Sequence, residues 1–169
     1  HMNELRKQTQ IRIDEDVIGL ESKHLILNNM RKKIGVSNYR RDGLEVATFT
    51  STEGDFSKRV ATSLNISFSA LNAPVIITVK KNTTILKNLI NYITESSALE
   101  GDKKLDVPML LIDDEADYAS VNGLADRNRV SRTNEYIRSL LNLFHKNHYV
   151  GYTATPFANV FIDPKEDDE

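Results

Sequence analysis

The sequence predicts an α/β domain of three layers, in which helices cover both faces of a parallel sheet. Short apolar segments rich in β-branched residues alternate with longer segments whose apolar residues recur at helical spacing. The connections between successive strands are long enough to hold a helix, as parallel neighbours require. With 169 residues, 40% of them hydrophobic, the chain is large enough to form one such core.

The first elements are a helix, a strand and a second helix. Residues 3–18 carry helix formers of mixed charge, and residues 44–51 (LEVATFTS) have the β-branched and aromatic content of a strand. Asp55 is expected to cap a helix over residues 56–67. Residues 73–81 (APVIITVKK) then predict a second strand, which ends in two lysines.

The remaining elements follow the same alternation. Asn82 or Thr83 is expected to cap a helix over residues 83–97. The next strand, residues 107–114, does not alternate apolar with polar residues, which predicts that both of its faces are covered. A helix over 134–144, capped by Ser131 or Thr133, and a strand over 148–156 complete the fold, and the acidic tail 163–169 is expected to be disordered.

Composition excludes several classes of protein. The chain has no cysteine, so disulfides and thiolate metal sites are ruled out. No apolar run approaches the roughly 20 residues that span a bilayer, and the N-terminus lacks a signal peptide, so a cytoplasmic protein without membrane contacts is expected. The net charge of -2 excludes a polycation but not local basic patches. Residues 1–2 (HM) have the sequence of an expression-tag remnant.

The segment PMLLIDDEADYAS places acidic side chains where a buried strand ends. Asp113, Asp114 and Glu115 are consecutive, and Asp117 follows. Ligands of parallel α/β sheets bind beyond the carboxyl ends of the strands, and carboxylates there suit a hard cation such as Mg²⁺, held through water. Glu115 could orient or deprotonate a water molecule. The alternative is that Asp114 or Glu115 only caps the next segment.

Other strand ends carry polar groups that point to the same edge of the sheet. The segment GYTATP ends in Thr153 and Thr155, whose hydroxyls can donate to a carboxylate. Lys80 and Lys81 stand just before a helix N-terminus, where cations and backbone N–H groups together favour phosphate. A purely structural domain has no need of such an edge, which favours a functional site there.

The combination of LLIDDEAD and GYTATP, one helical crossover apart, resembles the motor core of superfamily-two helicases and translocases. More narrowly, the chain resembles the helicase-like region of bacterial Z-one-domain endonucleases. The segments that carry this resemblance are LRKQTQIRIDED, PVIITVKKN, LLIDDEADYAS with TNEYIRSLL, and VGYTATPFANVF. The resemblance spans about residues 5–162. It implies that residues 3–162 form part of a RecA-like motor lobe, from a bacterial DNA-processing or defence system.

The resemblance also implies roles for individual residues. Asp114 would hold the Mg²⁺ of ATP through water, and Glu115 would position the attacking water. Asp117 would bond to Thr153 or Thr155 and couple nucleotide state to a neighbouring lobe. The region of such motors that contacts nucleic acid is matched by Lys80, Lys81 and Asn82, with DNA expected rather than RNA.

The chain also departs from the family. None of its glycines belongs to a G-x-x-x-x-G-K-[ST] phosphate loop, which is expected upstream of residue 1 together with its strand, and the second motor lobe is missing. Phosphoryl transfer needs all these parts, so the chain alone is expected to bind no cofactor and to hydrolyse no ATP. The strand at 148–156 would be left with an open edge, where self-association is expected.

Two other functions remain open from the residues. In a metal-dependent nuclease, Asp113, Asp114 and Glu115 would bind the metal while Lys80 or Lys81 steadied the phosphate, although such sites draw carboxylates from separate elements. In a non-catalytic α/β interaction module, the same residues would serve only the fold.

Overall fold

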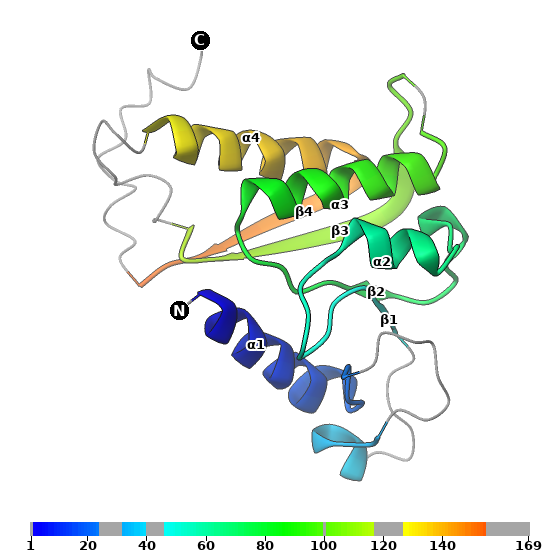
Figure 1. Ribbon diagram of the computed structural model, residues 1–169, viewed down its shortest axis with the longest axis vertical. Coiled ribbons are helices and arrows are strands. Elements are labelled where there is room, and N and C mark those ends of the chain that lie inside the picture. Colours follow the sequence, from blue (N-terminus) through cyan, green and yellow to red (C-terminus); the bar gives the residue numbers. More distant parts are fainter. Residues whose placement is uncertain (1, 24–31, 40–45, 100, 117–126, 155–169) are drawn as a thin grey trace. The chain divides into compact units, whose positions relative to one another are not determined.

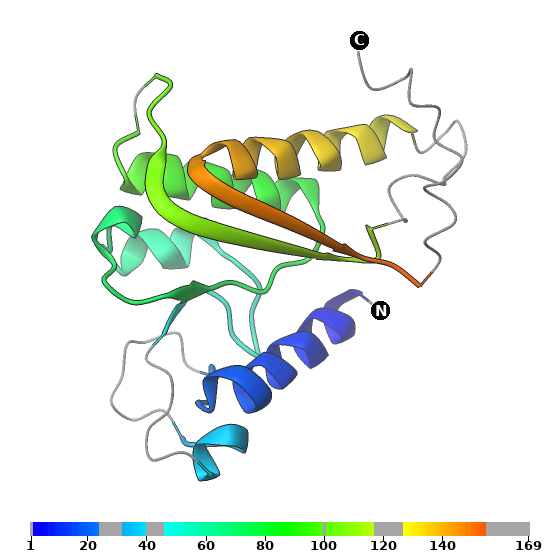
Figure 2. The same ribbon diagram turned by 180° about the vertical axis from the view of Figure 1, so that it is seen from behind.

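The computed structural model describes residues 2–23, 32–39, 46–99, 101–116 and 127–154, which form two compact units, His1–Glu100 and Gly101–Glu169. Helices alternate with parallel strands in both units (Figures 1 and 2), which confirms the α/β class. The described strands form two separate two-stranded sheets, so a single three-layer sheet stays a prediction. Within these residues, no helix combines the length and apolarity that crossing a membrane requires.

The first unit begins with α1 (Met2–Ile13), which continues as the π-helical turn η1 (Asp14–Ile18) and so confirms the helix predicted over residues 3–18. Gly19 ends it in the left-handed conformation, with φ 77°, and its N–H donates to the Asp14 carbonyl. A Cβ at Gly19 would come within 2.8 Å of the Ser37 Cβ, which lies in the short 3-10 helix η2 (Gly35–Asn38). Glycine is therefore needed there for both conformation and space.

The buried face of this helix is polar. Gln10 and Asp14, four residues apart, are 0% and 1% exposed. Gln10 Nε2 donates to Asp14 Oδ1 at 3.0 Å, and the Ser22 N–H and hydroxyl donate to Asp14 Oδ2 at 2.9 and 2.6 Å. Gln10 Oε1 accepts from the Thr50 hydroxyl at 2.9 Å, and that hydroxyl accepts from the Thr78 N–H at 3.0 Å. The chain of bonds fixes α1 against the segments that follow the two strands of this unit.

Those strands are shorter than predicted. β1 (Ala47–Thr48) pairs in parallel with β2 (Val75–Ile76). Between them lie α2 (Lys58–Ser63) and the 3-10 turn η3 (Phe68–Ala70). The prediction that Asp55 caps α2 is wrong, because Ser57 occupies the N-cap position. The Asp55 carboxylate instead accepts from the Phe56 and Lys80 N–H groups, which ties the segment before α2 to the segment between β2 and the next helix.

The second long helix of this unit, α3 (Thr83–Ser96), confirms the predicted cap. Asn82 Oδ1 accepts from the Thr84 and Ile85 N–H groups at 2.9 and 3.3 Å. Its buried face includes Leu86, Leu89, Tyr92 and Ile93, at helical spacing. The Tyr92 ring packs against Phe49 and Phe56, with ring centroids 5.3 and 5.8 Å apart, and forms the apolar core of the unit.

The second unit is one strand–helix–strand crossover. β3 (Leu105–Asp114) pairs in parallel with β4 (Phe144–Tyr152), and α4 (Arg127–Asn142) joins them and lies along the pair (Figures 1 and 2). Ser131 and Thr133 do not cap α4, because the helix already begins at Arg127. The last strand starts four residues before the predicted position, since Phe144 belongs to β4 rather than to the helix.

One face of this strand pair is exposed, contrary to the prediction that both faces are covered. Four apolar side chains on it are between 41% and 62% exposed: Leu110, Ile112, Val150 and Tyr152. The buried apolar side chains of this unit are Leu105 and Phe144 at the start of the two strands and Ile137 and Leu140 on α4. An apolar run in the sequence indicates that both faces of a strand favour burial, but it does not show whether elements of the same chain bury them.

The hydrogen bonds to Asp14 yield a stability prediction. Asp14→Ala would leave Gln10 Nε2 and both Ser22 donors without their buried acceptor, so the free energy of unfolding should fall by about 3 kcal/mol. Asp16→Ala is the matched control, because Asp16 is exposed on the same turn and its loss should change stability by less than about 0.5 kcal/mol. Urea denaturation of both variants measures the difference, and equal effects would contradict a structural role for the network.

Candidate functional site

The acid cluster and the threonine segment meet at the carboxyl ends of neighbouring strands. In the parallel ladder Asp113 lies opposite Gly151, and Asp114 lies opposite Tyr152, the residue before Thr153. The expectation that Asp114 and Thr153 lie at adjacent strand ends is therefore confirmed. In open parallel sheets this is the edge where ligands bind.

The three consecutive carboxylates of this end take different environments. Asp113 is 7% exposed, whereas Asp114, the next residue along the strand, is exposed. Successive strand residues point to opposite faces of a sheet, so these two side chains diverge. Asp114 Oδ1 accepts from the Glu115 N–H at 3.0 Å. The repulsion that three adjacent acids predict is relieved by this separation.

Glu115 turns the chain sharply at the end of β3. Its φ is 55°, in the left-handed region that non-glycine residues rarely adopt. Such a conformation costs on the order of 1 kcal/mol and is concentrated at functional sites. Asn65 and Ala98, each with φ 49°, share this conformation elsewhere in the described part of the chain.

Asp113 is held by a tyrosine of the neighbouring strand. The Tyr149 hydroxyl donates to Asp113 Oδ2 at 2.8 Å. Tyr149 lies opposite Leu111, so its side chain reaches diagonally across the ladder and passes the position of Gly151. A Cβ at Gly151 would lie 3.1 Å from the Ala116 Cβ and 3.5 Å from the Tyr149 hydroxyl. The glycine of GYTATP thus leaves room for this contact.

Not every predicted site residue is described. Asp117 and Thr155 lie outside the described residues, so their predicted partnership with Thr153 stays a prediction. Thr153 itself is half-buried directly after β4. Of the predicted nucleotide site, the structure brings Asp114, Glu115 and Thr153 to one edge of the sheet.

The predicted nucleic-acid residues lie in the other unit, after β2. The Lys80 ammonium contacts Asn3 Oδ1 at 2.6 Å and forms an ion pair with Asp55 at 3.7 Å. Lys81 is half-buried, and the Asn82 side chain serves as the cap of α3. The three residues therefore already have structural contacts, and their role toward nucleic acid stays a prediction.

The sequence motifs did not single out Arg6, which the structure makes the most unusual cation of this unit. Its side chain is 8% exposed, yet Nη1 has no hydrogen-bond partner within the described part of the chain. Arg6 is one turn from Asn3, which contacts Lys80, and one turn from the buried Gln10. The i, i+4 spacing of Arg6, Gln10 and Asp14 could have revealed a polar buried stripe.

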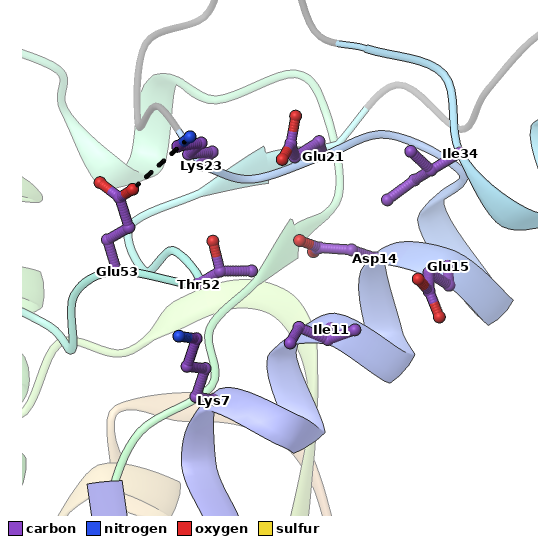
Figure 3. A pocket seen from close by; sticks show the side chains of 9 residues that line it. All are labelled: Lys7, Ile11, Asp14, Glu15, Glu21, Lys23, Ile34, Thr52 and Glu53. Carbon is purple, nitrogen blue, oxygen red and sulfur yellow. Dashed lines mark ion pairs between the residues drawn. The ribbon is translucent and has the colours of Figure 1, made fainter. Parts of the chain in front are cut away.

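A pocket of about 410 Å³ lies beside α1 in the first unit, lined by residues of both charges (Figure 3). Lys23 pairs with Glu53 across its rim at 3.9 Å, and Asp14 is already bonded to Gln10 and Ser22. None of the predicted site residues lines it. We therefore assign the pocket no function.

Comparisons with known proteins add no relative. No protein-family model matches the chain, and searches among curated proteins and among solved structures find no match either. The likeness to helicase motors therefore rests on the sequence motifs.

The Tyr149–Asp113 contact predicts an alkaline titration. Burial, followed by the hydrogen bond and charge of Asp113, raises the pKa of Tyr149 from 10.0 to about 12. The neutral phenol therefore favours the folded state below pH 10, and this contribution is lost as the pH rises from about 10 to about 12. Asp113→Asn should lower the pKa of Tyr149 but leave it above 10.0, because burial is the larger cause.

The measurement is the near-ultraviolet absorbance as a function of pH. Subtracting the titration curve of Tyr149→Phe from that of the wild type leaves the ionisation of the Tyr149 phenol. A Tyr149 that ionises near pH 10.0 in the wild type would contradict the contact with Asp113.

Proposed function

We propose that the chain carries part of the ATP-binding lobe of a nucleic-acid helicase or translocase with a RecA-like, three-layer fold. The Z-one-domain endonucleases are the family it resembles most in its motifs. The observation that supports the proposal is the parallel ladder that brings Asp114 and Glu115 next to Tyr152 and Thr153. A DEAD-type acidic motif and a Thr-Ala-Thr motif need this adjacency to act on one ligand.

The residues at this edge fit a hydrated magnesium ion. Asp114 is exposed and offers a carboxylate oxygen, the ligand type that Mg²⁺ prefers, usually with several waters retained. When bound, the ion would neutralise phosphate charge during phosphoryl transfer. Asp114 holds the hydrated cation, and Glu115, placed by its left-handed backbone, orients a water molecule. Thr153 offers a hydroxyl from the adjacent strand end.

Nucleic acid is the proposed partner of the first unit. Lys80 is positioned by Asp55 and Asn3, and Arg6 shares the same face of α1 with Asn3. A buried guanidinium nitrogen without an acceptor is costly, and a phosphate oxygen would satisfy it once the side chain turned outward. This unmet donor supports a backbone-binding surface of Arg6, Lys80 and Lys81, with DNA as the expected nucleic acid.

The divergence of the acid cluster disfavours the metal-dependent nuclease. Two-metal nucleases need carboxylates that converge, whereas Asp113 is buried against Tyr149 and Asp114 is exposed. Self-association along the outer edge of β4 stays a prediction, since the structure pairs that strand with β3 alone within the described residues.

The cation site is tested with Mn²⁺, a paramagnetic substitute for Mg²⁺, by electron paramagnetic resonance of the chain. Asp114→Asn should weaken Mn²⁺ binding by at least about tenfold, because it removes the proposed carboxylate. Asp106→Asn, at the opposite end of the same strand and also exposed, is the matched control and should leave the affinity unchanged. Equal affinities for the two variants would contradict the proposal. In a longer chain, DNA-stimulated ATP hydrolysis lost in Glu115→Gln would separate the motor from an interaction module.

The nucleic-acid surface is tested by a matched pair of arginines on one helix. Arg6→Gln should weaken binding of a single-stranded oligonucleotide and reduce the slope of log affinity against log salt by about 0.7, the value for one phosphate contact. Arg12→Gln removes the same charge from an exposed position of α1 and should change the slope little. Identical slopes in the two variants would contradict a specific role for Arg6.

A further inference from the structure

The sequence between residues 31 and 41 concentrates positive charge that neither proposed site uses. It reads RKKIGVSNYRR, with five basic residues and no acid, in a chain whose net charge is -2. The structure describes residues 32–39 of this segment, so Arg31, Arg40 and Arg41 enter the argument by their charge alone. Cations gathered in this way form a local patch that attracts a polyanion even when the whole chain is acidic.

Tyr39 lies at the end of the described part of this segment, almost entirely in water. It is 94% exposed, whereas the other exposed large apolar residues of the described chain are between 38% and 62% exposed. A single exposed aromatic residue is common on protein surfaces and needs no explanation by itself. What distinguishes Tyr39 is that a fixed and basic segment presents it.

Backbone hydrogen bonds fix the start of that segment against the end of the first helix. The Glu21 N–H donates to the Lys32 carbonyl at 3.0 Å, and the Ile34 N–H donates to the Gly19 carbonyl at 3.0 Å. The 3-10 helix η2, which follows directly, lies beside the end of that helix (Figures 1 and 2). The segment is therefore held from its first described residues onward.

A glycine lets η2 pack directly on the preceding π-helical turn. Gly35 has φ 50°, and a Cβ there would overlap the Glu15 carbonyl group, so no other residue allows this approach. Ser37, in the middle of η2, is 5% exposed, and the Tyr39 N–H donates to the Val36 carbonyl at 3.1 Å. The backbone that carries the tyrosine ring is thus already ordered, so little conformational freedom is lost when the ring binds a ligand.

Two exposed lysines precede η2 on the same fixed segment. Lys32 and Lys33 are both exposed, and Lys33 forms an antiparallel bridge with Leu20, as an extended chain does. Successive residues of an extended chain point to opposite sides, so the pair places one ammonium on each side of the segment. Glu15 and Glu21 of the adjoining elements offset part of this charge, and the basic excess of residues 31–41 remains.

We propose that Tyr39 is a stacking platform for a base of single-stranded nucleic acid, with Lys32 as a cation for a nearby phosphate. The inference rests on the nucleic-acid partner proposed above for the first unit, to which it adds the form of the strand and a contact with a base. An exposed aromatic ring beside cations is the chemistry that binds single strands with little sequence preference. In a duplex the faces of the bases are covered by their stacked neighbours, so the ring favours unpaired bases.

The same cations would also be attracted to an anionic membrane surface. Binding in a membrane interface needs a broad apolar face, however, and the residues before Tyr39 in η2 are the polar Ser37 and Asn38. One aromatic ring among polar and basic residues therefore fits a base better than a lipid interface.

The test measures fluorescence anisotropy of the chain with two labelled probes, an oligothymidine strand and an abasic strand of the same length and charge. Tyr39→Ala should weaken binding of oligothymidine by at least about fivefold, because it removes the stacking surface. It should leave the affinity for the abasic strand unchanged. Tyr39→Phe keeps the ring and should bind both strands as the wild type does.

Two further variants separate stacking from charge. Asn38→Ala, at the exposed neighbouring position of η2, is the matched control and should bind both strands with wild-type affinity. Lys32→Gln should weaken binding of both strands alike and reduce the slope of log affinity against log salt by about 0.7. Circular dichroism of each variant confirms that it is folded.

The outcomes distinguish two failures. If Tyr39→Ala weakens binding of the two strands equally, matches Asn38→Ala, or lowers binding to phosphatidylserine vesicles but not to oligothymidine, the stacking role is overturned. In each of these cases the effect of Arg6→Gln on strand binding still tests the proposed function separately. If the wild-type chain binds neither strand, the proposed nucleic-acid partner fails and this inference fails with it.

Discussion

The parallel ladder between β3 and β4 is the constraint on which the candidate site depends. Because both strands run in the same direction, they end at the same edge, and α4 supplies the return crossover that this pairing requires. The register matters as much as the direction. A slip of one residue in β3 would place Asp114 on the buried face and expose Asp113. The ladder is irregular between Leu105 and Pro108, and from there the pairing runs without a break from Pro108 and Lys146 to Asp114 and Tyr152.

Given this register, the chemistry of the edge follows from how its charges are divided. Strand alternation separates Asp113 from Asp114, and Glu115 follows them with a left-handed backbone. At about 4 Å, two like charges repel by about 1 kcal/mol in water and several times more near a protein surface. Placing adjacent acids on opposite faces of the strand avoids this repulsion and makes a run of acids compatible with a stable fold.

The sequence predicted well those features that are set by local pattern. Asn82 caps α3, and the apolar segments give parallel strands that end in Asp114 and Tyr152. Features set by tertiary contacts were missed. Asp55 looked like a helix cap, but its carboxylate is used to hold Lys80. Tyr149 was not singled out from the sequence, because no local pattern shows that Gly151 lets it reach a residue 36 positions away.

The buried face of α1 is polar, with Arg6, Gln10 and Asp14 all less than a tenth exposed. A helix that serves only the fold normally buries apolar side chains, because polar groups must be paired to repay their dehydration. Gln10 and Asp14 meet that condition through Thr50 and Ser22, so their burial is explained by the tether to the strand ends. Arg6 does not meet it fully, since Nη1 lacks an acceptor within the described residues. Arg6 is therefore a buried cation with an unpaired N–H donor, and it lies one turn from Asn3, which contacts Lys80. Such a group lowers the stability of the fold, and an anionic ligand that accepted from it would offset that cost.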